Sequence, residues 1–196
     1  IDYPSVNQVT LVELEPKVLG VIKAFAPYNH DVLNQPKLKI VLNDGRNHLL
    51  TTKKKYDVIT ADPIHPWFRG AGYLYTQEYF QLAASRLNEG GVVAQWLPLY
   101  QMEPEHMSSV LKTFTQAFDH AMIFIAYADA ILIGSNQPLR LDVERLRAML
   151  EIPEIQNDMQ QVRMGDVYAL LSYFMMGDDG VKKAATDAII NTDNNL

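Results

Sequence analysis

The chain has 196 residues, of which 48% are hydrophobic and 20% charged, and it contains no cysteine. This hydrophobic fraction supports a folded core and excludes wholesale disorder. The lack of cysteine excludes disulfides, thiolate zinc sites and cysteine nucleophiles. The formal net charge of −6 repels phosphate backbones, so nucleic acid is not an expected partner. No apolar run approaches the ~20 residues of a membrane span, so this piece is not itself expected to be transmembrane.

Strand-like and helix-like segments alternate through the first two thirds of the chain, which predicts an α/β fold with a mostly parallel sheet and helices on its faces. Short apolar runs predict strands at Val9–Leu14, Leu38–Leu42, Tyr56–Asp62 and Gly91–Leu97. Helices are predicted from Pro16, from Asp44-Gly45, from Thr76 to about Asn88 with Gly90-Gly91 closing it, and from Pro104. A closing antiparallel pair is predicted at His120–Tyr127 and Ala130–Gly134.

The strand pattern stops after Ser135. Helices are predicted beyond that point at Asp142–Leu150, Glu154–Val162, Asp166–Met175 and Asp179–Ile190. We therefore divide the chain into an α/β domain, residues 1–135, and a C-terminal helical extension, residues 136–196, which would act as a lid or an interface.

Acidic residues follow successive predicted strands. Glu13 ends the first strand, Asp44 the second and Asp62 the third, while Gln95 lies near the end of the fourth. Ligands of open α/β sheets bind beyond the carboxyl ends of the strands, and unpaired carboxylates are costly to bury. Several acids at one edge therefore indicate a binding site, although a single one is usually a helix cap or a turn former.

Each acid has a physical role available. A carboxylate at the position of Glu13 suits the ribose hydroxyls of a nucleoside, with Glu15 as the helix-capping alternative. Asp44 can accept from an adenine amino group, and Gly45 lets the backbone approach the base. Asp62 opens the segment DPIHPW, residues 62–67, whose two prolines stiffen the loop. The alternative for Asp62 is a rigid turn with a capping carboxylate.

Other catalytic templates are missing. The sequence has no G-x-S-x-G elbow, no H-E-x-x-H, no Walker loop and no EF-hand loop. Its five histidines show no ligand spacing, so no metal site is predicted. Of these histidines, His65 alone lies beside a candidate catalytic group.

Five motifs occur in an order that resembles the spermidine/spermine synthase family of aminopropyltransferases, which have a Rossmann-like, class I methyltransferase-type fold. They are VELEP with Glu13, NDGR at 43–46, YDVITADP at 56–63, LYTQEYF at 74–80 and GGVVAQW at 90–96. The resemblance covers about Val9 to Gly134. Three segments, DPIHPW at 62–67, GAGYLY at 70–75 and NTDNNL at 191–196, are most similar to bacterial and archaeal proteins in which such a domain follows a transporter-like membrane region.

The resemblance implies roles for individual residues. It implies that Glu13 binds the ribose of the sulfonium nucleoside, that Asp44 and Gly45 contact the adenine, and that Asp62 orients and deprotonates the attacking amine. Further residues expected to bind substrate are His65, Tyr75 and Gln95. The implied reaction is transfer of an aminopropyl group from decarboxylated S-adenosylmethionine to an amine, leaving methylthioadenosine.

The resemblance also sets expectations for partners and location. No tightly bound cofactor is expected, because the decarboxylated nucleoside, or S-adenosylmethionine, is a co-substrate. Family members commonly dimerise, so a homodimer is one expectation. We expect a cytoplasmic protein, with attachment to the inner face of the cell membrane if a longer parent chain carries membrane spans.

Two departures from the family pattern keep other functions open. The family holds its diamine with a second Asp, and His65 stands at that position. The family's first strand, its glycine-rich loop and the following helix have no counterpart, and the chain begins at Ile1, so we expect a fragment with low activity by itself. One alternative is an S-adenosylmethionine-dependent methyltransferase, since Asp-Pro with a nearby aromatic resembles the D-P-P-Y loop of amino methyltransferases. The other is a non-catalytic nucleoside-binding or interaction module.

Overall fold

The computed structural model describes residues 1, 3–63, 65–68, 70–185 and 187–195. The chain forms two compact units, and each is described by itself. Unit 1 comprises Ile1–Thr52 and Arg147–Gly165, and unit 2 comprises Lys53–Leu146 and Asp166–Leu196. The sequence analysis divided the chain after residue 135, where the predicted elements change from strands to helices. That division was not based on contacts, and it stays a prediction.

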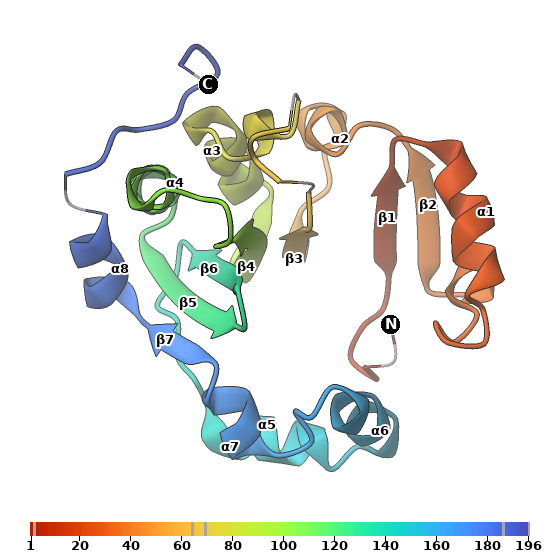
Figure 1. Ribbon diagram of the computed structural model, residues 1–196. Coiled ribbons are helices and arrows are strands. Elements are labelled where there is room, and N and C mark those ends of the chain that lie inside the picture. The colour runs from red at the N-terminus through yellow and green to blue at the C-terminus, as the bar shows by residue number, and fades with distance from the viewer. Residues whose placement is uncertain (2, 64, 69, 186, 196) are drawn as a thin grey trace. The chain divides into compact units, whose positions relative to one another are not determined.

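Unit 1 contains a two-stranded parallel sheet and short helices (Figure 1). The strands β1 and β2 pair in register from Val9 opposite Leu38 to Glu13 opposite Leu42. The elements are β1 (Val9–Glu13), α1 (Pro16–Ala24), the 3-10 helix η1 (Val32–Asn34), β2 (Leu38–Leu42), α2 (Gly45–Thr51) and α6 (Pro153–Gln161), with the last turn of α5 (Val143–Leu150).

Local capping explains where the helices of unit 1 begin. The Glu15 carboxylate accepts a hydrogen bond from the Lys17 N–H at 2.9 Å, and Pro16 occupies the first helical turn of α1, where a missing N–H costs little. Asp44 caps α2 by accepting from the Asn47 N–H at 2.8 Å. The core of this unit is thin, and Phe25, the residue directly after α1, is 55% exposed.

Unit 2 contains a five-stranded sheet in the order β3-β4-β6-β5-β7 (Figure 1). Its strands are β3 (Tyr56–Ala61), β4 (Leu87–Pro98), β5 (His120–Ala126), β6 (Asp129–Ser135) and β7 (Phe174–Met176). Its helices are η2 (Gly72–Leu74), α3 (Gln77–Ser85), α4 (Pro104–Ala117), α7 (Val167–Leu171) and α8 (Asp178–Ala184), with the start of α5.

This sheet is mixed rather than mostly parallel. The β3–β4 pair is parallel, whereas β4–β6, β5–β6 and β5–β7 are antiparallel. The predicted antiparallel pair is confirmed as β5 and β6, whose two-residue connection, Tyr127 and Ala128, permits only that direction. Among the described residues β3 lies at the edge of its sheet, and its Val58 is 58% exposed.

Two local predictions in unit 2 were wrong. Gly90 and Gly91 do not close a helix but lie inside β4, and α3 already ends at Ser85. A Cβ on Gly91 would lie 3.0 Å from the carbonyl oxygen of Tyr56, so this glycine permits close approach of β3. The helix predicted through Met175 is interrupted by β7, because Phe174 pairs with Phe124 of β5.

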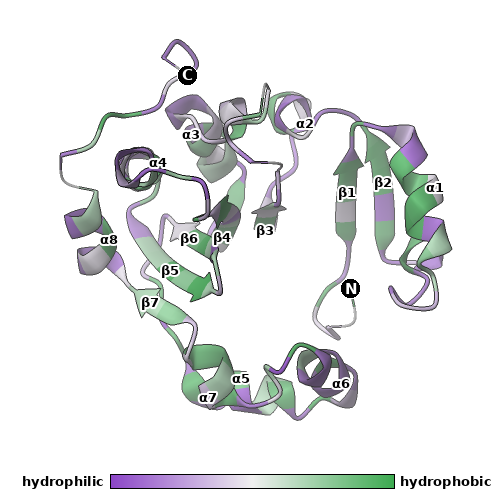
Figure 2. Ribbon diagram, in the orientation of Figure 1, coloured by the Kyte–Doolittle hydropathy of each residue, from purple (hydrophilic) through white to green (hydrophobic). Residues whose placement is uncertain are grey.

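The main core lies in unit 2, between the sheet and its helices. Figure 2 shows most of β5 in green, as a hydrophobic strand. Helices α3 and α4 pack together, as do α4 and α8, while α3 contacts β4 and α8 contacts β5. On α4, Val110, Leu111 and Phe114 are buried, and Phe118 follows them into the core. The rings of Phe114 and Phe118 lie 4.6 Å apart.

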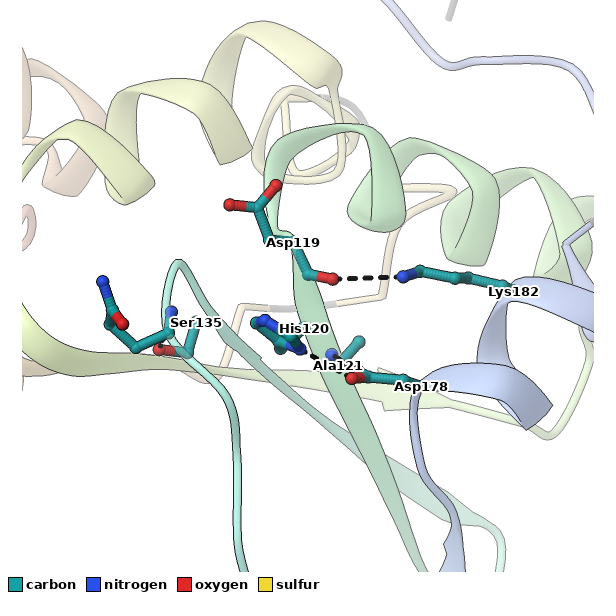
Figure 3. Close-up of polar contacts among 7 residues, drawn as sticks. Asp119, His120, Ala121, Ser135, Asp178 and Lys182 are labelled. Carbon is teal, nitrogen blue, oxygen red and sulfur yellow. Dashed lines mark hydrogen bonds and ion pairs between the residues drawn. The ribbon is translucent and has the colours of Figure 1, made fainter.

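Polar contacts fasten α8 to the start of β5 (Figure 3). Asp178 bonds to the His120 Nδ1 at 2.7 Å and accepts from the Ala121 N–H at 2.5 Å, while Lys182 donates to the Asp119 carbonyl at 3.2 Å. Burial by itself raises the pKa of Asp178, but the two hydrogen bonds and the nearby positive charges outweigh it and lower that pKa below its usual value.

No helix among the residues that the structure describes combines the length and the hydrophobicity needed to cross a membrane.

Candidate functional site

Glu13 and Asp44 lie at the same edge of the sheet in unit 1. Their strands are parallel, and the Asn43 N–H donates to the Glu13 carbonyl at 3.0 Å across this edge. Glu13 Oε1 accepts from the Glu15 N–H at 2.8 Å, and Asp44 Oδ1 accepts from the Asn47 N–H in the first turn of α2. A carboxylate has two oxygens and several lone pairs, so such a local bond leaves capacity for a ligand hydroxyl or amino group.

Gly45 begins α2 directly beside Asp44. A Cβ built on Gly45 would meet no atom within 4 Å, so the space above its backbone is open. Asp44 and Gly45 are both exposed, and Glu13 is half-buried. The structure therefore places the three predicted nucleoside-binding residues close in one unit and leaves two of them accessible.

Asp62, Tyr75 and Gln95 lie together in unit 2. Asp62 follows the end of β3, where Ala61 is opposite Gln95 of β4, and its side chain is exposed. Tyr75 is buried, and its hydroxyl donates to the Trp96 carbonyl at 3.0 Å. Burial is the main cause that raises the pKa of Tyr75 above its usual value; the Gln95 side chain lowers this pKa, and the negative charge of Asp62 raises it.

The side chain of Gln95 is fully buried and incompletely paired. Its Nε2 donates to the Trp96 carbonyl at 3.4 Å, while its Oε1 has no hydrogen-bond partner within the described part of the chain. A buried amide oxygen without a partner costs about 1–3 kcal/mol. The Gln95 side chain lies beside the Tyr75 phenol, whose pKa it lowers.

His65 is surrounded by aromatic rings. Its Nε2 lies 2.8 Å from the Tyr100 hydroxyl oxygen, and its ring centroid is 4.8 Å from that of Trp67 and 5.6 Å from that of Trp96. The Trp96 indole N–H donates to Asp129 Oδ1 at 3.1 Å. Ile64, between Asp62 and His65, lies outside the described residues.

Sequence reasoning missed Trp96, Tyr100 and Asp129 as neighbours of His65. A signal was available for Trp96, because alternate residues of a strand face opposite sides of the sheet. Val93, Gln95 and Leu97 are buried on one face of β4, which directs Trp96 to the other. The sequence carried no comparable signal for the Tyr100 contact, which joins residues 35 positions apart.

A hollow formed by described residues of unit 1 contains none of the predicted site residues. It is lined by His30 and polar residues of α6, and His30 Nε2 lies 3.2 Å from Asp158 Oδ1. Within the described ranges, no group of three or more His, Asp and Glu side chains has the geometry to hold a metal ion.

The structure thus forms two groups of predicted residues. Unit 1 joins Glu13 with Asp44 and Gly45, and unit 2 joins Asp62 with Tyr75 and Gln95. Trp96 links the second group to His65, because its carbonyl binds Tyr75 and its ring faces the imidazole. That the two groups act on one ligand stays a prediction.

Comparisons with known proteins agree on a family. The model of the spermine/spermidine synthase domain matches residues 1–132. Polyamine aminopropyltransferase 1 of Pseudomonas aeruginosa is 31% identical over 104 residues, which are 52% of this chain and 36% of that protein. The chain therefore spans about a third of the length of this curated relative.

Solved structures show the same fold. Spermidine synthase from Thermotoga maritima superposes with a TM-score of 0.68 at 17% identity, covering 93% of this chain and 62% of that one. A spermidine synthase in complex with the transition state analogue AdoDATO gives a TM-score of 0.72, also at 17% identity, with the same coverage of 93% and 62%. These likenesses confirm the α/β, methyltransferase-type fold.

Proposed function

Since the chain belongs to the spermine/spermidine synthase family, we propose that it binds a sulfonium nucleoside and transfers the aminopropyl group of that nucleoside to an amine. The observation that carries this proposal is the position of the acids at strand ends. Glu13 is the last residue of β1 and Asp44 lies just after the parallel strand β2, while Asp62 follows β3, whose last residue is opposite Gln95. Ligands of α/β sheets bind at such ends.

The residues of unit 1 suit the nucleoside. Glu13 would accept from the two ribose hydroxyls, and Asp44 from the adenine amino group. The open space above Gly45 would admit the flat base close to the backbone. Both carboxylates also favour the positively charged sulfonium over the neutral thioether product, and this preference helps product release.

The residues of unit 2 suit the amine. The lone pair of the amine nitrogen attacks the aminopropyl carbon bonded to sulfur, the carbon–sulfur bond breaks, and its electron pair stays on sulfur as methylthioadenosine. The nitrogen gives its extra proton to Asp62 and then to solvent. Tyr75, held neutral by burial, and the unpaired Gln95 oxygen would orient the N–H groups of the amine.

Nucleoside binding tests the first half of this proposal. Calorimetric titration of the protein with methylthioadenosine should show binding that Glu13→Gln and Asp44→Asn weaken. Both substitutions remove a charge and keep an oxygen for the local bonds to Glu15 and Asn47, and Asn is a good helix cap. Absence of heat from the folded, unmodified protein would refute nucleoside binding.

Product analysis tests the second half. The protein is incubated with an amine and either decarboxylated S-adenosylmethionine or S-adenosylmethionine, and the masses of the products are measured by mass spectrometry. The proposal is supported if the amine gains an aminopropyl group and if the Asp62→Asn variant does not form this product. Gain of a methyl group identifies a methyltransferase instead. Nucleoside binding with no product, and with no effect of Asp62→Asn on function, identifies a non-catalytic module.

Three further parts of the proposal rest on the family resemblance. They are the absence of a tightly bound cofactor, a homodimer, and a cytoplasmic location that a longer chain would attach to the membrane. Light scattering of the purified protein tests the dimer, and fractionation of cells that express the whole gene tests the location.

A further inference from the structure

An aromatic surface surrounds the residue that departs from the family pattern. We call it the ring cluster and define it as His65, Trp67, Phe68, Trp96 and Tyr100. The His65 centroid lies 4.8–5.7 Å from the centroids of the other four rings. We propose that the ring cluster selects the acceptor amine, favouring a primary amine with an apolar or aromatic body over a linear diamine. This inference rests on the proposed function.

The chemistry of His65 disfavours a second ammonium group. A linear diamine presents one nitrogen for reaction and carries a second positive charge at its far end. An imidazole is neutral or positive, so it offers that charge no ion pair. Its Nε2 is already hydrogen-bonded to the Tyr100 hydroxyl at 2.8 Å. Exposed cation–π contacts between the second ammonium group and the rings would raise the affinity for the diamine only about two- to fivefold.

The outer rings of the cluster offer apolar surface instead. Trp67 is 44% exposed, Phe68 52% and Tyr100 40%. An amine that buried about 60 Å² of its apolar surface against these rings would gain about tenfold in affinity. The apolar gain therefore exceeds what the same rings can give to a distal ammonium group.

The ring cluster lies next to the group expected to activate the amine. Trp96 belongs to both, because its ring stands 5.6 Å from His65 and its carbonyl accepts from the Tyr75 hydroxyl. Tyr75 in turn senses the charge of Asp62. Asp62 and His65 are also only three positions apart in the chain, so an amine nitrogen directed at Asp62 would have the rings within reach of its remaining atoms.

Hydrogen bonds hold the inner rings in place before any ligand binds. Asp129 fixes the Trp96 indole at 3.1 Å, and Tyr100 fixes the imidazole. Pre-ordered side chains lose little conformational entropy on binding. The inner rings of the cluster are therefore preorganised before a ligand binds.

Intrinsic fluorescence can test this selection without catalysis. The chain has two tryptophans, Trp67 and Trp96, and both belong to the ring cluster. Titration with 2-phenylethylamine should change their emission with a Kd at least about tenfold lower than that of 1,4-diaminobutane. Equal affinities, or tighter binding of the diamine, would overturn the proposal.

Charge substitution at the centre of the cluster should reverse the preference. His65→Asp should tighten 1,4-diaminobutane up to about fivefold and weaken 2-phenylethylamine, since it creates an ion pair and removes a ring. His106→Asp is the matched control, because His106 is exposed on α4 and makes no ring contact with the cluster among the described residues. If His106→Asp reversed the amine preference as His65→Asp does, the effect would not come from the ring cluster, and the proposal would be overturned.

A second pair of variants covers the case in which His65→Asp does not fold. Trp67→Ala should weaken 2-phenylethylamine about tenfold by calorimetry and leave the diamine unchanged, whereas Trp67→Phe should retain most of the binding. An unchanged ratio in Trp67→Ala would overturn the proposal.

A parallel titration with methylthioadenosine separates the two proposals. Amine selection without nucleoside binding supports the ring cluster and refutes the proposed function, while nucleoside binding without amine selection overturns the ring cluster alone.

Discussion

Gly134 offers a severe test of how the core of unit 2 is packed. A Cβ at this position of β6 would lie 2.6 Å from Phe118 Cγ and 2.7 Å from Phe114 Cζ. Both rings are almost fully buried, and they also pack against Phe80, with centroids 5.0 Å from Phe114 and 6.4 Å from Phe118. Neither ring can retreat without displacing the other.

Gly134→Ala should therefore destabilise the protein by about 2 kcal/mol, a typical cost of inserting a methyl group into a packed core. In a domain of this size that cost lowers the Tm by roughly 5–10 °C. Calorimetry or urea unfolding followed by circular dichroism measures the change. Gly20→Ala in α1 is the control, since nothing lies within 4 Å of its Cβ and alanine should stabilise an exposed helix by up to about 1 kcal/mol.

A double mutant isolates the cause. Phe118→Leu makes room for the new methyl group, so Gly134→Ala should cost less in that background than in the original protein. Equal costs in both backgrounds, or an unchanged Tm in the single variant, would refute the account of steric conflict at Gly134.

Three other predictions concern polar contacts of unit 2. Because the pKa of Asp178 is lowered, its stabilising effect is present above the unfolded value of 3.8 and is lost as pH falls through the folded pKa. Asp178→Ala should thus cost about 1 kcal/mol near pH 7, a modest figure for a partly exposed pair, and almost nothing near pH 2 in urea unfolding. Asp129→Ala should shift tryptophan emission to the red by releasing the Trp96 indole, whereas Asp129→Asn, which keeps an acceptor, should not. Tyr75→Phe should cost about 1–2 kcal/mol by chemical denaturation, since it leaves the Trp96 carbonyl without its phenol donor.

Helix starts were predictable because each depends on residues close in sequence. Glu15, Asp44, Thr76 and Asp166 all accept from backbone N–H groups two or three residues ahead. The buried face of α4 is also a local feature, because its apolar residues Val110, Leu111 and Phe114 recur at the helical repeat in the sequence.

Strand limits that depend on distant partners were not predictable. Phe174–Met176 reads as the end of an apolar helix, yet it extends as β7 because the edge of β5 supplies hydrogen bonds and the Phe124 ring. Gly90 and Gly91 resemble a helix end, yet they continue β4 because β3 lies close beside them. In both cases a tertiary neighbour outweighs the local propensity.

The candidate site divides in the same way. Strand ends, and with them Glu13, Asp44 and Asp62, could be located from apolar runs followed by acids. The surroundings of His65 could not be predicted, because Trp96 contacts it from β4 and Tyr100 contacts it from the loop that follows β4.

The register of one strand pair determines the inner side of the ring cluster. In the antiparallel pair of β4 and β6, Pro98 is opposite Asp129 and Trp96 is opposite Ile131. Trp96 and Asp129 are therefore diagonal neighbours on one face of the sheet, within reach of their hydrogen bond. A slip by one residue would turn Gln95 toward the rings and Trp96 toward the core. The register of β4 against β6 thus helps to determine which side chain meets the loop after β3, and amine selection would depend on β6 as much as on His65.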